Sequence, residues 1–124
     1  MIKRKKKHIL VAEDDTFLLE IMKKALLEQG VRVSTARNGQ EAIDIIDEDA
    51  PQLLFLDVLM PHIDGYGVLQ HRKKKGLKFP VVACSNLGDK ANRDKCKALG
   101  VNAYLIKSDI DEDALWPLAE KYLK

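Results

Sequence analysis

Acidic side chains follow two apolar runs of this 124-residue chain. Glu13 and Asp14 come directly after the run 8–12, "HILVA", and Asp57 ends the run 52–57, "QLLFLD". Clustered carboxylates repel one another at neutral pH unless a cation lies between them or their pKa values rise. Carboxylate oxygens are hard ligands of the kind that Mg²⁺ prefers. These acids therefore indicate magnesium-assisted phosphoryl transfer, with Asp57 as the covalent acceptor.

A hydroxyl and an ammonium group follow two further apolar runs. Ser85 ends the run 79–85, "FPVVACS", and Lys107 ends the run 101–107, "VNAYLIK". The Ser85 hydroxyl could donate a hydrogen bond to a phosphate oxygen, and Lys107 could pair with Asp57 or with a phosphate. Each residue alone has an ordinary interpretation as a strand-end or surface residue. Their joint placement after successive runs favours one shared site.

The elements that must position these side chains alternate along the chain. Apolar, largely β-branched runs predict strands over 8–12, 31–36 (a half-exposed edge strand), 52–57, 79–85 and 101–107. The segments between and after them predict helices over 14–30, 38–50, 64–76, 88–100 and 111–124. This alternation is typical of an α/β fold with a parallel sheet and helices on both faces. In such folds the ligand site lies outside the carboxyl ends of the strands, where all five side chains fall.

Three of the predicted helices carry finer expectations. In the first, the predicted inner face consists of Phe17, Leu18, Ile21, Met22, Ala25 and Leu26. Asp15 or Thr16 can cap its start, and Gly30 can close its end. The helix over 88–100 is the least apolar and is expected to be the least firmly held. In the last helix, Pro117 is tolerated if the helix starts near Asp113 and otherwise kinks it.

Composition and charge exclude several classes of protein. No apolar run approaches the length of a membrane span, and no h-region follows the basic N-terminus, so a cytoplasmic protein is expected. The net charge of +2 provides no general case for nucleic-acid binding. Cys84 and Cys96 lack metal-ligand spacing and are expected to stay reduced. The run Lys3–Lys7 predicts a solvated arm over 1–7 ahead of a domain over 8–124; contact with an acidic partner, a lipid surface or nucleic acid is the alternative.

Four motifs make the chain resemble the receiver domain of two-component response regulators from about His8 to Leu123. They are "ILVAEDD", "LLFLDVLMPHIDGYGVL", "PVVACSN" and "GVNAYLIKS". The second is the most specific, because Met60–Pro61 and Asp64–Gly65 follow the acid at the family's spacing. The resemblance implies a flavodoxin-like (βα)5 three-layer sandwich with strand order 2-1-3-4-5.

The resemblance also implies a role for each site residue. Asp57 would be the phospho-acceptor, with Lys107 and Ser85 beside it. Mg²⁺ would be bound directly by Asp14 and Asp57, through water by Glu13, and by the main-chain carbonyl of Leu59. Ser85 and Tyr104 would form the switch pair.

By the same resemblance the protein would be a phosphorylation-dependent switch and not an enzyme beyond its own phosphorylation and dephosphorylation. A histidine kinase or phosphotransfer protein would donate the phosphoryl group. The surface of the fourth helix, fifth strand and fifth helix would then change its affinity for an unidentified downstream protein. A stand-alone receiver, monomeric or weakly dimeric and without direct nucleic-acid or membrane binding, is expected because no output domain follows.

Three positions depart from the family pattern. Ser108 follows Lys107 where proline is common, and a serine normally follows a trans peptide bond. Asn86 replaces a typical small alanine and could narrow access to the phosphate. Leu59 is apolar at a position that influences hydrolysis of the phospho-aspartate, so a long-lived phosphorylated form is expected.

Other functions fit these residues less well. A small α/β enzyme with an aspartyl-phosphate intermediate would usually need a second acid where Leu59 stands. A dinucleotide binder lacks its G-x-G-x-x-G motif, no P-loop is present, and the acidic "EDDTF" is unlike a flavin phosphate loop. A docking module that works without phosphorylation stays open.

Overall fold

The structure is a computed structural model that describes residues 6–86 and 90–123. Five strands alternate with five helices: β1 (His8–Ala12), α1 (Thr16–Leu27), β2 (Arg32–Ala36), α2 (Gly39–Glu48), β3 (Leu53–Asp57), α3 (Gly65–Lys74), β4 (Val81–Ser85), α4 (Lys90–Ala98), β5 (Ala103–Ile106) and α5 (Glu112–Tyr122). A short 3₁₀ turn, Lys107–Asp109, connects the last strand to the last helix. Residues 1–5 of the expected N-terminal arm, residues 88 and 89 of the expected fourth helix, and Lys124 lie outside the described residues.

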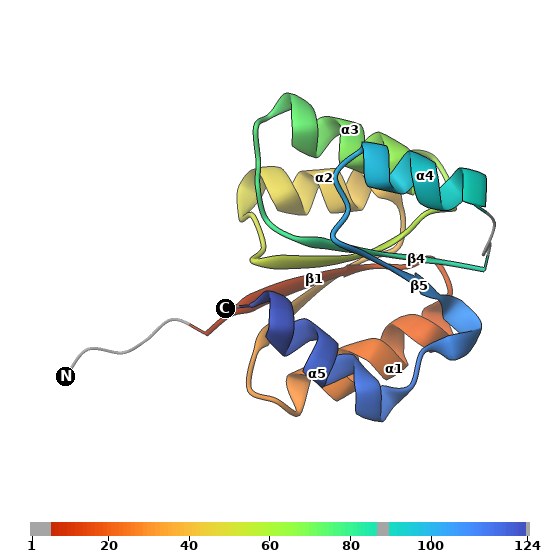
Figure 1. Cartoon of the computed structure of the whole chain (residues 1–124). Helices are drawn as coiled ribbons and strands as arrows, with labels where there is room; N and C mark the ends of the chain where they lie inside the picture. The colour runs from red at the N-terminus through yellow and green to blue at the C-terminus, as the bar shows by residue number, and fades with distance from the viewer. Residues whose placement is uncertain (1–5, 87–89, 124) are drawn as a thin grey trace.

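The sheet is parallel throughout, in the order β2-β1-β3-β4-β5, which confirms the predicted flavodoxin-like architecture. Helices α1 and α5 cover one face, and α2, α3 and α4 cover the other (Figure 1). Strands β1, β3 and β4 are buried at every position, as expected for strands covered on both faces, whereas β2 is half exposed at the sheet edge. Because all strands run the same way, their carboxyl ends form one edge of the sheet.

Helix α1 shows where the hydrophobic pattern was misleading. The prediction placed Phe17 on the inner face, but Phe17 is 77% exposed. Met22 and Leu26 are buried as predicted, and Leu18, Ile21 and Ala25 are half-buried. The remaining buried residue of the helix is Leu19, which was not predicted, so the inward face is centred away from Phe17. The sequence presents consecutive large apolar residues here, and periodicity alone cannot decide which of them faces the sheet. The Asp15 carboxylate caps the helix by accepting hydrogen bonds from the main chain of Phe17 and Leu18.

The end of α1, the packing of α4 and the position of Pro117 in α5 were also predicted from the sequence. Gly30 follows α1 with a φ of +80°, the left-handed conformation that favours glycine at a helix end. Only Cys96 is buried within α4, which agrees with the expectation of a lightly anchored helix. Helix α5 starts at Glu112, near the Asp113 start at which Pro117 is tolerated. Pro117 is its sixth residue and cannot donate the hydrogen bond that a non-proline residue would make there.

Candidate functional site

The carboxyl edge of the sheet brings the predicted site residues together. Glu13 and Asp14 follow β1, Asp57 ends β3, Ser85 ends β4, and Lys107 follows β5. β3 lies between β1 and β4, which places Asp57 at the centre of the group. A pocket of about 500 Å³ opens at this edge. Its lining includes five of the predicted residues (Asp14, Asp57, Leu59, Ser85 and Lys107) together with Asn86 and Ser108.

Lys107 bridges two acids from different strands. Its ammonium nitrogen lies 2.9 Å from Oδ2 of Asp57 and 2.9 Å from Oε1 of Glu13. Both carboxylates are 2% exposed, so the contacts are shielded from bulk water. A second oxygen of Glu13 accepts a hydrogen bond from the Asp15 main-chain N–H at 2.9 Å. Lys107 therefore holds a positive charge against Asp57 inside the fold.

The three carboxylates form a compact oxygen cluster. One oxygen from each of Glu13, Asp14 and Asp57 lies within 4.8 Å of the others. Asp14 is exposed at the opening, while Glu13 and Asp57 are buried beneath it. Hard oxygen donors from three acids, with one side open for water or phosphate oxygens, fit the coordination that Mg²⁺ prefers. The residues present therefore suit the predicted cation.

Burial raises the pKa of Asp57 to about 8, and a hydrogen bond with Asp14 and the negative charge of Glu13 act in the same direction. Burial alone would also raise the pKa of Asp14, but hydrogen bonds with Asp57 and Glu13 and the charge of Lys107 outweigh it, so the pKa of Asp14 is lowered. The pKa values of the two neighbouring acids are thus shifted in opposite directions, so that Asp57 favours its neutral form and Asp14 its charged form. This separation is what crowded carboxylates require when they share a site.

The backbone around Asp57 is also ordered by the site. The Leu59 main-chain N–H donates a hydrogen bond to Oδ1 of Asp57 at 3.2 Å. The Leu59 side chain is 54% exposed and lines the pocket.

Every peptide bond among the described residues is trans, including the one between Lys107 and Ser108. Behind the site, Cys84 pairs in register with Asp57, and burial raises the pKa of its thiol to about 12.

Tyr104 lies away from the pocket. It is half-buried on β5, packed against a cluster that includes Val58, Tyr66 and Cys96. The guanidinium carbon of Arg93 on α4 lies 5.3 Å from the centre of its ring. Tyr104 therefore connects β5 to α4.

The sequence did not indicate that three apolar residues and one glycine contribute to the site. Phe17, Leu18 and Ile21 of α1 line the pocket on the side of Asp14. Gly65, which the sequence indicated only as part of the Asp64–Gly65 motif, begins α3 so close to β3 that a Cβ there would lie 2.5 Å from the Asp57 carbonyl oxygen. Contacts of this kind leave no mark in the periodicity of a single sequence.

Gly65→Ala is expected to destabilise the fold by about 2–4 kcal/mol, because the added methyl group meets backbone atoms that cannot rotate away. Urea unfolding followed by circular dichroism measures the change. Gly67→Ala in the same helix is the matched control, since its Cβ would meet the Ile63 side chain, which can shift. Equal stability losses in the two variants would contradict the steric explanation.

Comparison with known proteins agrees with this geometry. Residues 9–117 match the family model described as the response regulator receiver domain. A probable transcriptional regulator, ycf27, from Cyanophora paradoxa is 39% identical over 102 residues, covering 82% of this chain and 42% of the relative. The response regulator MprA from Mycolicibacterium vanbaalenii is 32% identical over 107 residues, covering 86% of this chain and 46% of the relative. The chain thus spans less than half the length of these curated relatives.

Solved structures show the same fold. The receiver domain of the Francisella response regulator 1452 superposes with a TM-score of 0.87 at 26% identity, covering 94% of this chain and 96% of that one. The receiver domain of NtrX from Brucella abortus superposes with a TM-score of 0.83 at 28% identity, covering 93% and 97%. None of the helices in the described part of the chain has the length and apolar character needed to cross a bilayer. With the family model matched over most of its length and the acids gathered at one edge of a 2-1-3-4-5 sheet, the chain belongs to the response regulator receiver domains, which are signalling proteins.

Proposed function

We propose that this chain accepts a phosphoryl group on Asp57 from a histidine kinase or phosphotransfer protein and works as a phosphorylation-dependent switch. The observation that carries the proposal is the Lys107 ammonium 2.9 Å from a buried Asp57 carboxylate, next to two further acids. The switch would occupy residues 8–124, with residues 1–7 as a basic arm ahead of it.

In the proposed reaction, Asp57 reacts as its carboxylate, the form that Lys107 and a bound cation would favour, and one of its oxygens attacks the phosphorus of the donor. The new O–P bond forms as the bond from phosphorus to the donor nitrogen breaks, and the electron pair leaves with the donor. Glu13, Asp14, Asp57 and the Leu59 carbonyl would hold Mg²⁺, which when bound neutralises charge on the phosphoryl oxygens. Lys107 supplies a fixed positive charge beside the acceptor, and this charge is already in place before the donor arrives.

The signal is proposed to leave through α4, β5 and α5. Phosphorylation adds negative charge at Asp57, and the Ser85 hydroxyl would follow the new phosphate oxygens. Tyr104 would then reorient against α4, which Cys96 alone anchors as a buried residue. Repacking of this surface would change its affinity for a downstream protein.

A direct labelling experiment tests the proposal. The protein is incubated with Mg²⁺ and a small phosphodonor, and the adduct is located by mass spectrometry. An acid-stable, base-labile phosphate on Asp57 that is absent from Asp57→Asn and from metal-free samples supports the switch. Turnover of an external substrate would favour a small enzyme with an aspartyl-phosphate intermediate. Partner binding without any adduct would favour a docking module.

Leu59→Asn is expected to shorten the lifetime of the phosphorylated form by about three- to tenfold. The apolar side chain lines the pocket beside Asp57, and an amide there could hold the water that hydrolyses the acyl phosphate. A time course of phosphate release from the purified phosphoprotein measures it. Leu27→Asn changes another exposed leucine, which lies at the end of α1 and not beside Asp57, and should leave the lifetime of the phosphorylated form unaltered. An unchanged or slower Leu59→Asn protein would count against the shielding role.

A further inference from the structure

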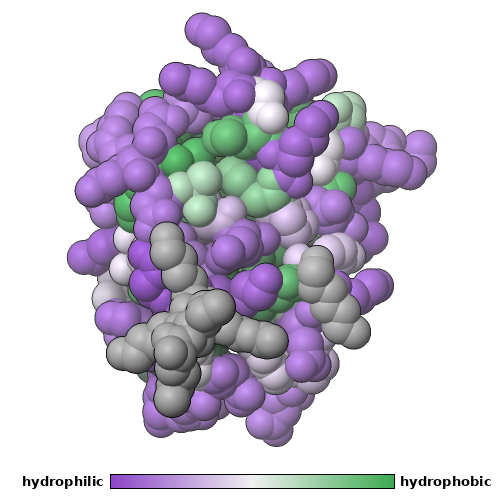
Figure 2. Space-filling view, turned by 90° about the vertical axis from the view of Figure 1, so that its left-hand side faces the viewer, coloured by the Kyte–Doolittle hydropathy of each residue, from purple (hydrophilic) through white to green (hydrophobic). Residues whose placement is uncertain are grey.

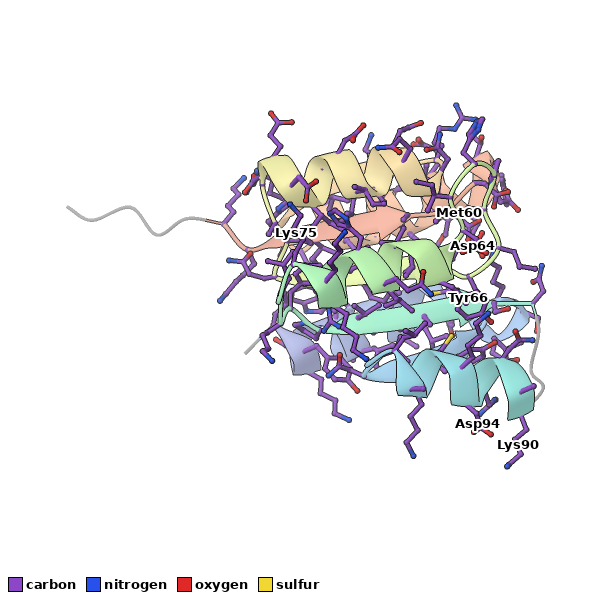
Figure 3. All side chains as sticks on the ribbon, turned by 90° about the horizontal axis from the view of Figure 1, so that it is seen from above. Met60, Asp64, Tyr66, Lys75, Lys90 and Asp94 are labelled. Atoms are coloured by element: carbon purple, nitrogen blue, oxygen red, sulfur yellow. The ribbon has the colours of Figure 1, made fainter. Side chains whose placement is uncertain are left out.

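The modest net charge of the chain conceals a strong separation of charge in the fold. The acids of the site gather at the carboxyl edge of the sheet, whereas lysines gather at the opposite, amino-terminal edge. Figure 3 shows Lys75 at the other end of α3 from Asp64. Figure 2 shows this amino-terminal edge, which is mostly hydrophilic with one hydrophobic area in its upper half. We call the following residues the basic edge: Lys6, Lys7, Lys73, Lys74, Lys75 and Lys78, all exposed.

Two segments far apart in the sequence build the basic edge. Lys6 and Lys7 lead into β1, and the Lys7 carbonyl accepts a hydrogen bond from the Arg32 main chain at 2.8 Å. The lysines from Lys73 to Lys78 end α3 and lead into β4. Since only β3 separates β1 from β4, the two segments enter the sheet about 10 Å apart. The sequence before Lys6 continues the basic run to Lys3.

Three acids at the end of α2 lie nearest this edge, Asp47, Glu48 and Asp49, and they are fewer than its six lysines. Oδ1 of Asp47 lies 2.8 Å from Nε2 of His71, and the Asp47 carboxylate also interacts electrostatically with Lys75. Asp49 pairs with Arg32 at 2.6 Å. Within the described part of the chain, the lysines from Lys73 to Lys78 make no ion pair. Lysines in the last turn of a helix stabilise the helix dipole, but that role does not require Lys78, which follows the helix.

A pocket of about 280 Å³ adjoins these lysines between the ends of α3 and α4. Three cations line it: Arg72, Lys73 and Lys78. Arg72 is 8% exposed and is held in place because two of its nitrogens donate hydrogen bonds to the Phe79 carbonyl. Among the described residues, none with a carboxylate or an aromatic ring lines this pocket; the Phe79 ring packs against the Arg72 guanidinium, 5.3 Å from ring centre to guanidinium carbon. A fixed guanidinium with flexible lysines at its rim suits phosphate, and the lack of an aromatic ring leaves no platform for stacked bases.

We propose that the basic edge binds the phosphate backbone of duplex nucleic acid without reading its sequence. Nucleic acid presents a high linear density of phosphates and binds basic surfaces by releasing counterions. Binding to an anionic membrane surface is favoured when apolar side chains insert beside the charges. Among the described residues, the exposed large hydrophobic side chains are Phe17, Leu27 and Leu59. Phe17 and Leu59 lie at the carboxyl edge, and Leu27 ends α1, on the opposite face of the sheet from the lysines of α3. The observations therefore favour nucleic acid over a lipid surface.

Fluorescence anisotropy with a labelled, mixed-sequence duplex of about 20 bp tests the proposal across a range of NaCl from about 50 to 200 mM. The triple variant Lys74→Gln/Lys75→Gln/Lys78→Gln is expected to bind at least tenfold more weakly at low salt. Its plot of log affinity against log salt should be shallower by about two to three units. The control Lys23→Gln/Lys90→Gln/Lys95→Gln makes the same change in net charge away from the basic edge and should bind within about twofold of the parent.

Several outcomes would overturn the proposal. They are absence of duplex binding at low salt, equal losses in both triple variants, and a strong preference for one duplex sequence. Binding to phosphatidylcholine vesicles with one third phosphatidylserine, or to polyglutamate, without binding to the duplex would assign a different partner. The test needs no phosphodonor or Mg²⁺, so its result is independent of phosphoryl acceptance by Asp57.

Discussion

Asp57→Asn is expected to make the metal-free protein more stable at pH 9, by about 2 kcal/mol or roughly 5–10 °C in Tm. The Asp57 carboxyl is 2% exposed, lies beside two other acids, and has its pKa raised to about 8. Above that pH the folded protein must hold an additional buried negative charge. An asparagine of almost the same size carries no charge there.

The sign of the pH dependence follows from the raised pKa. The folded state keeps the Asp57 proton up to about pH 8, whereas the unfolded chain releases it near its ordinary value of 3.8. Between these values the folded state binds more protons, so the stability that neutral Asp57 contributes declines as the pH rises through this window. The advantage of Asp57→Asn should therefore be small at pH 5 and reach its full size above pH 8.

Thermal unfolding in buffer with chelator, at pH 5 and pH 9, measures both effects. Adding Mg²⁺ at pH 9 should raise the Tm of the parent and leave that of Asp57→Asn nearly unchanged, because only the parent retains the full set of acids. Asp64→Asn is the control, since it also exchanges a carboxylate for an amide but preserves the cap at the start of α3. An equal advantage at both pH values would contradict the assignment of charge to Asp57.

Lys107→Ala is expected to lower the rate of phosphoryl acceptance by about 100-fold. The ammonium group lies 2.9 Å from Asp57 and from Glu13, so it stabilises charge that develops where the phosphoryl group arrives. The rate of adduct formation with a small phosphodonor, followed by mass spectrometry, measures the loss. Lys90→Ala on α4 is the matched control and should react at the rate of the parent.

A measurement of Mg²⁺ binding distinguishes loss of the Lys107 charge from a collapse of the whole pocket. Removing Lys107 leaves Glu13, Asp14 and Asp57 without their protein cation, so titration calorimetry should find Mg²⁺ bound as tightly as in the parent or more tightly. Weaker Mg²⁺ binding together with slow labelling would indicate a collapsed pocket. A rate within threefold of the parent would show that Lys107 is dispensable.

The sequence by itself determined the architecture and the membership of the site. Strand β3, Leu53–Asp57, is apolar at every position but the last, which is typical of burial on both faces and leaves the acid at the carboxyl end. Parallel strands must bring such ends to one edge, so Glu13, Asp57 and Lys107 could be grouped without coordinates. The strand order entered through the resemblance and not from the periodicity.

Only the tertiary structure decided the distances and the orientation of faces. The inner face of α1 follows from how that helix sits on β1 and α5, and the run of apolar residues around Phe17 is compatible with more than one rotation. The contact between Gly65 and the Asp57 carbonyl depends on the path of the intervening loop. The basic edge was hidden for the same reason: a net charge of +2 sums over the chain, whereas an electric field depends on where folding places each charge.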